Sequence, residues 1–258
     1  MVVSAVPRSS VRRLPQAWHL AAASVVASAL PLLMAAAPSS ATPVRSTAWA
    51  GYQATHDTFR QVSARWTVPA LTCPGTVSQE NADSALWAGL GPGYASSERV
   101  GVREFCTGTL ATYVAFLEMN GEYEVQAIDP TPGDRISAVV SFRSGKYGFA
   151  LADLTQGTSF HHRYRCGAFS QGSGTCLRST ADVLAGIFGP HLSTLADYGT
   201  VTFHSVSVTD ARGHRGSFAK NPHWSRSRLD EYQGTKLAAT PSVLSRRGTR
   251  FTDTWLHG

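Results

Sequence analysis

The chain has 258 residues, of which 43% are hydrophobic, so it is long enough to bury a sizeable core. The formal charge is +6 at pH 7, and it falls to +3 when the three arginines of the first 41 residues are left out. A charge this small gives no electrostatic basis for binding nucleic acid. Beyond residue 41, no apolar run approaches the length of a membrane-spanning helix.

Residues 1–41 have the pattern of a signal peptide. Arg8, Arg12 and Arg13 form a basic start, an alanine-rich apolar stretch covers residues 20–37, and the small-residue sequence "APSSA" follows. A membrane anchor is the alternative, but the apolar stretch contains a proline and ends at a small-residue site, which favours cleavage. We therefore expect a secreted, extracellular protein with no membrane attachment after signal removal. The paired arginines leave both the general and the twin-arginine export routes open.

The rest of the chain alternates between apolar and polar residues with a period of two, which is typical of β-strands. The segments with this pattern are 59–71, 112–119, 135–142, 147–166, 198–210 and 243–255. Pro69 ends the first segment, residues 129–134 form a turn, and Thr155–Gly157 is the expected turn of a hairpin within 147–166. Only residues 179–188, "STADVLAGIF", are expected to be helical.

Many short strands separated by Gly and Pro turns predict an all-β sandwich or barrel. The sequence shows no internal repeat and no linker rich enough in Pro or Ser to divide the mature chain. We expect a single domain over residues 42–258.

Residues 96–106, "SSERVGVREFC", raise a specific question. In a strand, Val100 and Val102 point to one face, and Arg99, Gly101 and Arg103 point to the other. The second face is either solvated or the floor of a site.

The four cysteines, all in the mature part, fit an oxidising compartment. Three pairings are possible for four cysteines. Cys166 and Cys176 bracket a Gly/Ser loop that a disulfide would close, which favours Cys166–Cys176 together with Cys73–Cys106. No short C-x-x-C spacing suggests a zinc site.

The sequence gives little support for a serine hydrolase, a phosphate-binding loop or a histidine metal site. There is no G-x-S-x-G motif of a serine hydrolase, and "GLGPG" at 89–93 is a turn rather than a phosphate loop. His161 and His162 are adjacent on a strand and face opposite ways, so they do not share a metal ion. Sugar binding by stacked tryptophans stays open, although tryptophans are more often core residues.

A succession of motifs resembles the glutamic peptidase family, the eqolisins, over residues 46–255. The motifs are "AWAG" at 48–51, "RWTVP" at 65–69, "SALWAGLG" at 84–91, "ERVGVREFC" at 98–106, "YVAFLEM" at 113–119, "STADVL" at 179–184, "DYGTVTF" at 197–203 and "LSRRGTRFTDTW" at 244–255. The resemblance implies a secreted, acid-acting endopeptidase. It also implies an antiparallel β-sandwich of two sheets, concanavalin-like and of jelly-roll type, that binds substrate on its concave sheet.

The family hydrolyses peptide bonds with a glutamine and a glutamate, and the resemblance places Arg99 and Asp182 at these two catalytic positions. Arg99 replaces the family's glutamine, and Asp182 replaces its glutamate. The resemblance further implies that Trp49, Trp87 and Glu118 bind substrate, with Ala48 in place of the usual asparagine. The reaction needs no metal and no cofactor, and the implied partner is a peptide or protein substrate bound by a monomer.

From these substitutions we expect Arg99 and Asp182 to form an ion pair that lowers the pKa of Asp182 and weakens hydrolysis. Three hypotheses follow. The protein is a peptidase with an altered dyad, a non-catalytic relative that binds a peptide or inhibitor, or a carbohydrate-binding sandwich.

Overall fold

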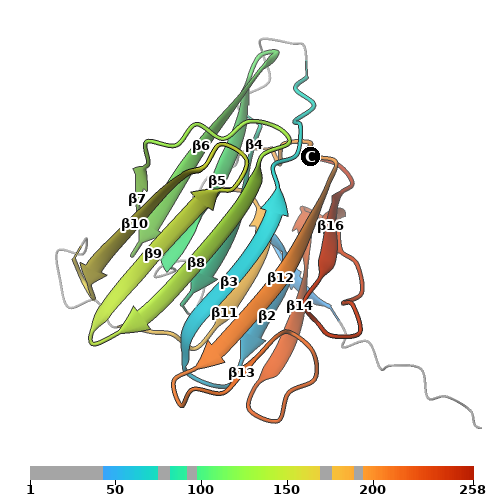
Figure 1. Ribbon diagram of the computed structural model, residues 1–258. Coiled ribbons are helices and arrows are strands. Elements are labelled where there is room, and N and C mark those ends of the chain that lie inside the picture. The colour runs from blue at the N-terminus through green and yellow to red at the C-terminus, as the bar shows by residue number, and fades with distance from the viewer. Residues whose placement is uncertain (1–42, 75–81, 92–97, 169–175, 189–193) are drawn as a thin grey trace, which may run out of the picture. The chain divides into compact units, whose positions relative to one another are not determined.

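The computed structural model describes residues 43–74, 82–91, 98–168, 176–188 and 194–258. Within these ranges the chain forms 16 strands and no helix. The strands build two layers that pack face to face (Figure 1). The expectation of an all-β, antiparallel sandwich is therefore confirmed.

The first layer is antiparallel throughout. Its order is β10 (Thr158–Arg165), β9 (Lys146–Asp153), β8 (Arg135–Arg143), β3 (Phe59–Thr67) and β12 (Thr200–Asp210), with the short β13 (Arg215–Gly216) beside β12.

The second layer contains the motifs of the predicted site. Its order is β14 (Ser225–Gln233), β2 (Trp49–Thr55), β11 (Ala181–Gly186), β4 (Asp83–Leu90), β5 (Glu98–Thr107), β6 (Leu110–Met119) and β7 (Glu122–Val125). All of these pair antiparallel, and β1 (Val44–Ser46) adds a parallel pairing to β14.

The two layers are joined by β15 (Lys236–Pro241) and β16 (Phe251–Trp255), which continue the pairing from β14 to β12. The first part of β12, Thr200–Phe203, pairs with β16, and the rest pairs with β3. The register shifts between His204 and Ser207, and Ser205 has a φ of 54°. Such a bulge bends a strand, and here it lets β12 pass from one sheet to the other.

The core lies between the layers and is formed by the inward residues of each alternating strand. In β3 these are Val62, Ala64 and Trp66, all fully buried, and the Trp66 ring meets Phe203 of β12 at 5.7 Å between centroids. In β5, Val100 and Val102 belong to the same core. The opposite face of β5 is therefore free to build a site.

The expected helix at 179–188 is wrong, because Ala181–Gly186 form strand β11. All six residues of β11 are buried, since it lies in the middle of the second layer. A strand buried on both faces loses its alternation and reads as a short apolar run, which periodicity alone does not separate from a helix. In 243–255 only the second expected strand, β16, is present.

Both predicted disulfides are present, Cys73–Cys106 and Cys166–Cys176. The predicted hairpin is also confirmed, with β9 and β10 joined by a turn at residues 154–157. Residues 1–41, and with them the signal peptide, lie outside the described part, as do Pro92 and Gly93 of "GLGPG". Among the described residues, no helix has the length and apolar character to cross a membrane.

Candidate active site

One row of residues crosses the second layer from edge to edge. Residues that stand opposite each other in paired strands point to the same side of a sheet. The register therefore places on one face Ser227 of β14, Gln53 of β2, Asp182 of β11, Gly89 of β4, Arg99 of β5, Glu118 of β6 and Tyr123 of β7. We call this set the polar row.

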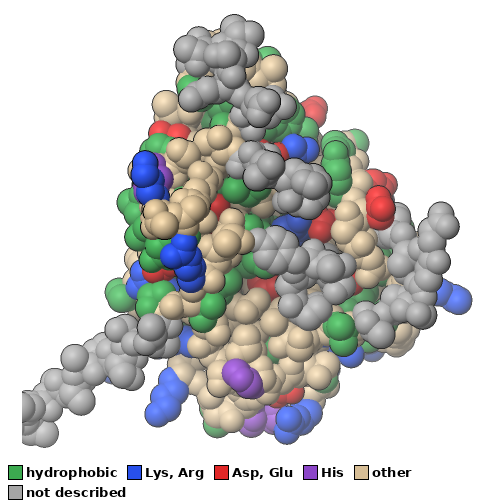
Figure 2. All heavy atoms as spheres, turned by 180° about the vertical axis from the view of Figure 1, so that it is seen from behind, with side chains coloured by type: hydrophobic (Ala, Val, Ile, Leu, Met, Phe, Trp, Pro, Cys, Tyr) green, Lys and Arg blue, Asp and Glu red, His purple; other side chains and the backbone are tan. Residues whose placement is uncertain are grey.

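The polar row lies on the face of the second layer that points away from the core. Val100 and Val102 pack into the core, so Arg99 and Gly101, on the other side of β5, face outward from the sandwich. A separate apolar cluster frames the row and includes Trp49, Trp87, Phe116, Leu184 and Phe188. Figure 2, seen from behind relative to Figure 1, shows acidic and basic side chains beside hydrophobic ones on this side of the molecule.

Arg99 is held by Glu118. Its Nε and Nη2 both donate to Oε2 of Glu118, at 3.0 and 2.7 Å. The guanidinium also lies near two rings, 4.8 Å from the centroid of Trp87 and 5.0 Å from that of Phe188. Burial raises the pKa of Glu118, and the charge and hydrogen bonds of Arg99 oppose this rise. The result is a buried, fixed cation in the middle of the row.

Asp182 is more isolated. Its side chain receives one hydrogen bond, from Oγ1 of Thr180 to Oδ2 at 3.1 Å, and its Oδ1 has no partner in the described part of the chain. Burial raises the pKa of Asp182 to about 7, against the opposing effects of Gln53, Thr180 and the charge of Arg99. With 2% of its surface exposed, this carboxyl group is stabilised in its neutral form.

The expected ion pair between Arg99 and Asp182 is therefore wrong, as is the expected low pKa of Asp182. Glu118 stands directly opposite Arg99 on the next strand and takes the guanidinium. Asp182 stands two strands from Arg99, with Gly89 between them, which separates the two backbones by about 10 Å.

Two buried polar atoms of the row lack a partner among the described residues. One is a donor, Nη1 of Arg99, and the other is an acceptor, Oδ1 of Asp182. They belong to residues on either side of Gly89, which places no side chain between them. An unpaired buried polar group is costly, so such groups are commonly satisfied by a ligand or water.

The structure brings the predicted site residues together. Trp49 and Trp87 meet edge to face, with ring centroids 6.0 Å apart, on the same face as Arg99, Glu118 and Asp182. Two neighbours were not predicted. Phe188 follows β11 and packs on Arg99, whereas Gln53 could have been found, because alternation from Trp49 puts it on the site face.

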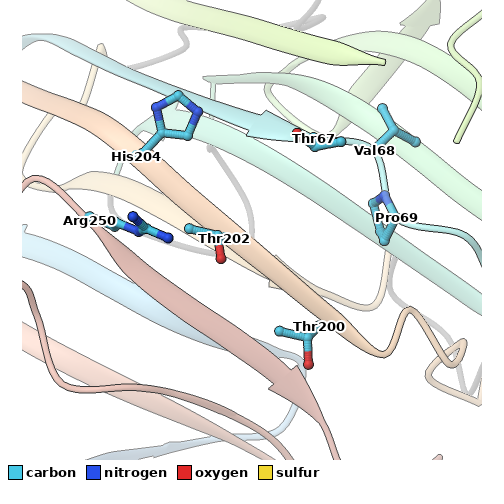
Figure 3. Close-up of a pocket in the computed structure, with 7 residues that line it drawn as sticks. All are labelled: Thr67, Val68, Pro69, Thr200, Thr202, His204 and Arg250. Atoms are coloured by element: carbon cyan, nitrogen blue, oxygen red, sulfur yellow. The ribbon is translucent and has the colours of Figure 1, made fainter. Parts of the chain in front are cut away.

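A hollow lies at the junction of β3, β12 and β16, away from the polar row (Figure 3). It is lined by Thr67, Val68, Pro69, Thr200, Thr202, His204 and Arg250. Burial, with the nearby charges of Arg65 and Arg250, lowers the pKa of His204. The lining contains no carboxylate, and none of its residues belongs to the polar row.

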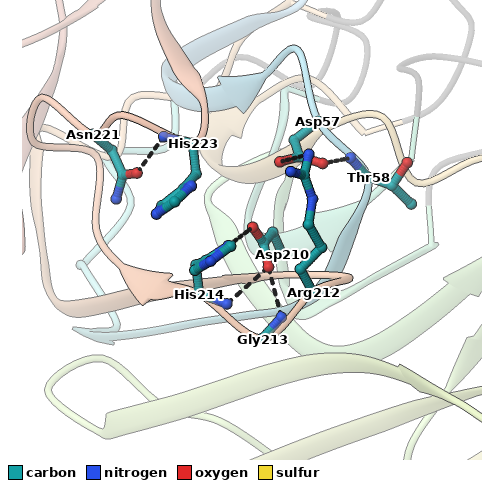
Figure 4. Close-up of polar contacts among 8 residues, drawn as sticks. All are labelled: Asp57, Thr58, Asp210, Arg212, Gly213, His214, Asn221 and His223. Carbon is teal, nitrogen blue, oxygen red and sulfur yellow. Dashed lines mark hydrogen bonds and ion pairs between the residues drawn. The ribbon is translucent and has the colours of Figure 1, made fainter.

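Asp210, His214 and His223 form a cluster of groups that could hold a metal ion (Figure 4). Oδ1 of Asp210 accepts hydrogen bonds from the backbone N–H groups of Gly213 and His214, and Oδ2 lies 2.6 Å from Nδ1 of His214. The two histidine rings stack 3.5 Å apart at an angle of 5°. Since nitrogen lone pairs lie in the ring plane, stacked parallel rings do not direct them at one ion. The cluster instead organises the turn between β12 and β13.

Comparisons with known proteins agree with this architecture. The model of the Peptidase A4 family matches residues 47–244, which is more than half of the chain, so the protein belongs to this family of glutamic peptidases. No curated protein sequence matches.

Three solved structures have a similar fold. Scytalido-glutamic peptidase, solved with a transition-state analogue inhibitor, is 20% identical, with a TM-score of 0.67 over 81% of this chain and 98% of that one. The eqolisin SCP-B, in complex with the tripeptide Ala-Ile-His, is 22% identical, with a TM-score of 0.65 and the same coverage. Aspergilloglutamic peptidase from Aspergillus niger is 21% identical, with a TM-score of 0.58 over 68% of this chain and 99% of that one.

Proposed function

We propose that the protein is a secreted endopeptidase in which Asp182 is the general acid and base and Arg99 stabilises the oxyanion. The observation that carries this proposal is the pair of unpartnered buried atoms, Oδ1 of Asp182 and Nη1 of Arg99, on either side of Gly89. Peptide hydrolysis needs an acceptor for the proton of water and a donor for the carbonyl oxygen. The polar row provides one of each.

In the proposed hydrolysis, Asp182 carries a proton from water to the leaving amine. The ionised Asp182 takes a proton from water while the water oxygen bonds to the carbonyl carbon of the substrate, whose oxygen becomes an anion next to Arg99. The protonated Asp182 then gives its proton to the amide nitrogen, the C–N bond breaks, and the carbonyl re-forms. The products are a carboxylic acid and an amine, and Asp182 returns to its ionised form.

The surroundings of Arg99 suit it to this role. Glu118 fixes the guanidinium through two hydrogen bonds, and the rings of Trp87 and Phe188 contact it. A donor that is already oriented and shielded from water stabilises a developing oxyanion more strongly than a mobile one does. Glu118 thereby serves as a positioning residue, and Trp49 and Trp87 form the apolar walls against which a substrate would lie.

The raised pKa of Asp182 sets the working pH. The carboxyl group must be ionised to deprotonate water, and its pKa is about 7. Hydrolysis should increase from acid pH toward pH 7 and level off above it, in contrast to an acid-acting family pattern. The substrate would be a peptide or unfolded protein, the protein would act as a monomer, and no cofactor would take part.

Digestion of an unfolded protein between pH 3 and pH 8, followed by mass spectrometry, tests this function. We expect internal cleavage by the wild type and none by Asp182→Asn. Asp253→Asn is the matched control, because Asp253 is also buried with a pKa raised to about 7 by burial but lies outside the polar row. Binding of peptides without cleavage by the folded wild type would instead support a non-catalytic relative.

A further inference from the structure

Gln53 lies on the side of Asp182 that faces away from Arg99. It stands directly opposite Asp182 in the pairing of β2 with β11, so Asp182 has Gln53 on one side and Gly89 on the other. Directly opposed residues of an antiparallel pair have Cβ atoms about 5 Å apart, within reach of a glutamine side chain. Of the two residues that stand opposite Asp182 in the neighbouring strands, Gln53 has a polar side chain and Gly89 has none.

The amide of Gln53 acts on the Asp182 carboxylate. After burial, which raises the pKa of Asp182, a hydrogen bond from Gln53 is the largest opposing influence. Oδ1 of Asp182 has no hydrogen-bond partner among the described residues, so this oxygen is open to a water. A glutamine amide carries two donors and an acceptor, and an ionised carboxylate only accepts. Together they offer what one bound water needs.

We propose that Gln53 is a positioning residue that holds the attacking water against Asp182, an inference that rests on the proposed function. Arg99 is unsuited to this task, because it lies two strands from Asp182 and its guanidinium is fixed by Glu118 on the strand beyond. The hydroxyl of Thr180 already donates to Oδ2 of Asp182. The water then lies over the Asp182 carboxylate, within reach of Gln53 and next to a carbonyl carbon over Gly89 whose oxygen points toward Arg99. The scissile bond crosses Gly89.

This arrangement gives the glutamine and the cation separate tasks. Gln53 and Asp182 orient and deprotonate the nucleophile, and Arg99 receives the charge that forms on the carbonyl oxygen. A role in stability alone would leave the pH profile of hydrolysis unchanged when the amide is removed, which distinguishes the two possibilities.

The test compares Gln53→Met, which keeps the length of the side chain and removes the amide, with Gln53→Glu and the control Gln61→Met. Gln61 lies on β3 in the first layer, outside the polar row. For each folded variant, kcat and KM for a peptide that the wild type cleaves are measured from pH 4 to pH 9. The pKa of the Asp182 carboxyl is followed by carbon NMR.

For Gln53→Met we expect kcat to fall about tenfold to a hundredfold while KM changes little, because a misplaced nucleophile slows the chemical step. The ascending limb of the pH profile and the NMR titration of Asp182 should both move to higher pH, since an influence that favours the charged form is lost. Gln53→Glu should move them further, because it adds a like charge. Gln61→Met should match the wild type.

Failure of the role of Gln53 and failure of the proposed function would give different results. Wild-type cleavage with Gln53→Met equal to it in kcat and in the pH limb would overturn the role of Gln53 and leave the proposed function intact. A folded wild type that cleaves nothing at any pH would overturn the proposed function, and the role of Gln53 with it.

Discussion

Arg99 and Glu118 stand opposite each other on β5 and β6, and the guanidinium gives two hydrogen bonds to a single oxygen of the carboxylate. With 5% and 4% of their surfaces exposed, both residues are buried. The pair adds no net charge to the polar row, and it leaves Asp182 as the row's unpaired acid. Arg99 is therefore a fixed donor, and Asp182 is the group available to exchange a proton.

Removal of one partner from this ion pair should be costly. Glu118→Gln leaves the buried charge of Arg99 without a counter-ion, so we expect the free energy of unfolding to fall by about 3–5 kcal/mol. Denaturant unfolding measures this loss. The double variant Arg99→Met with Glu118→Leu should lose much less than the sum of its two single variants. Additive losses would show that the two side chains do not interact.

Gly101 lies on the site face of β5, between Arg99 and Arg103. A Cβ at this position would lie 2.0 Å from the backbone oxygen of Leu86 and 2.9 Å from Trp87. Gly101→Ala should therefore force β4 and β5 apart and destabilise the protein by about 1–3 kcal/mol. Gly108→Ala is a control for the loss of a glycine, since its Cβ would meet no atom within 4 Å, although its positive φ adds some strain. Equal melting temperatures for Gly101→Ala and the wild type would contradict this packing.

Stability should decrease as pH rises. Burial raises the pKa of Glu98 and Glu231 to about 8, and that of Asp182 and Asp253 to about 7. Between their unfolded pKa values, about 4, and these folded values, the unfolded chain binds fewer protons than the native protein. Unfolding therefore becomes easier through this range. Thermal unfolding should show a higher melting temperature at pH 5 than at pH 8, and the reverse order would contradict the raised pKa values.

The Cys73–Cys106 disulfide links residues 33 positions apart. Closing a loop of this length should stabilise the protein by about 4 kcal/mol through the entropy of the unfolded chain. The Cys166–Cys176 disulfide spans 10 positions and should contribute about 1 kcal/mol less. Denaturant unfolding of the paired Cys→Ser variants compares the two. A larger loss from the shorter loop would argue against this entropic explanation.

Much of the fold could be predicted from alternation, with two failures: the first strand expected in 243–255 is absent, and a strand without alternation was taken for a helix. β3 and β8 have one face on the core, so their apolar residues alternate and their strands are evident in the sequence. β11 is buried on both faces and was expected to be a helix. Its position in the middle of the second layer depends on pairings with β2 and β4, which are distant in sequence.

The members of the site were easier to predict than their partners. Alternation in 96–106 correctly put Arg99 and Gly101 on one face, and the family motifs led to Asp182 and Glu118. The partner of Arg99 depends on register, because a cation pairs with the acid directly opposite before one that lies two strands away. The pKa of Asp182 depends on burial, which is a property of the assembled sheets.

The pH dependence of kcat/KM for a defined peptide, in the wild type and in Asp182→Asn, shows whether Asp182 is the catalytic base. We expect an ascending limb with an apparent pKa of about 7 in the wild type, because ionised Asp182 is the base. We expect no measurable turnover by a folded Asp182→Asn. Turnover by Asp182→Asn with an unchanged limb would show that another group carries the proton.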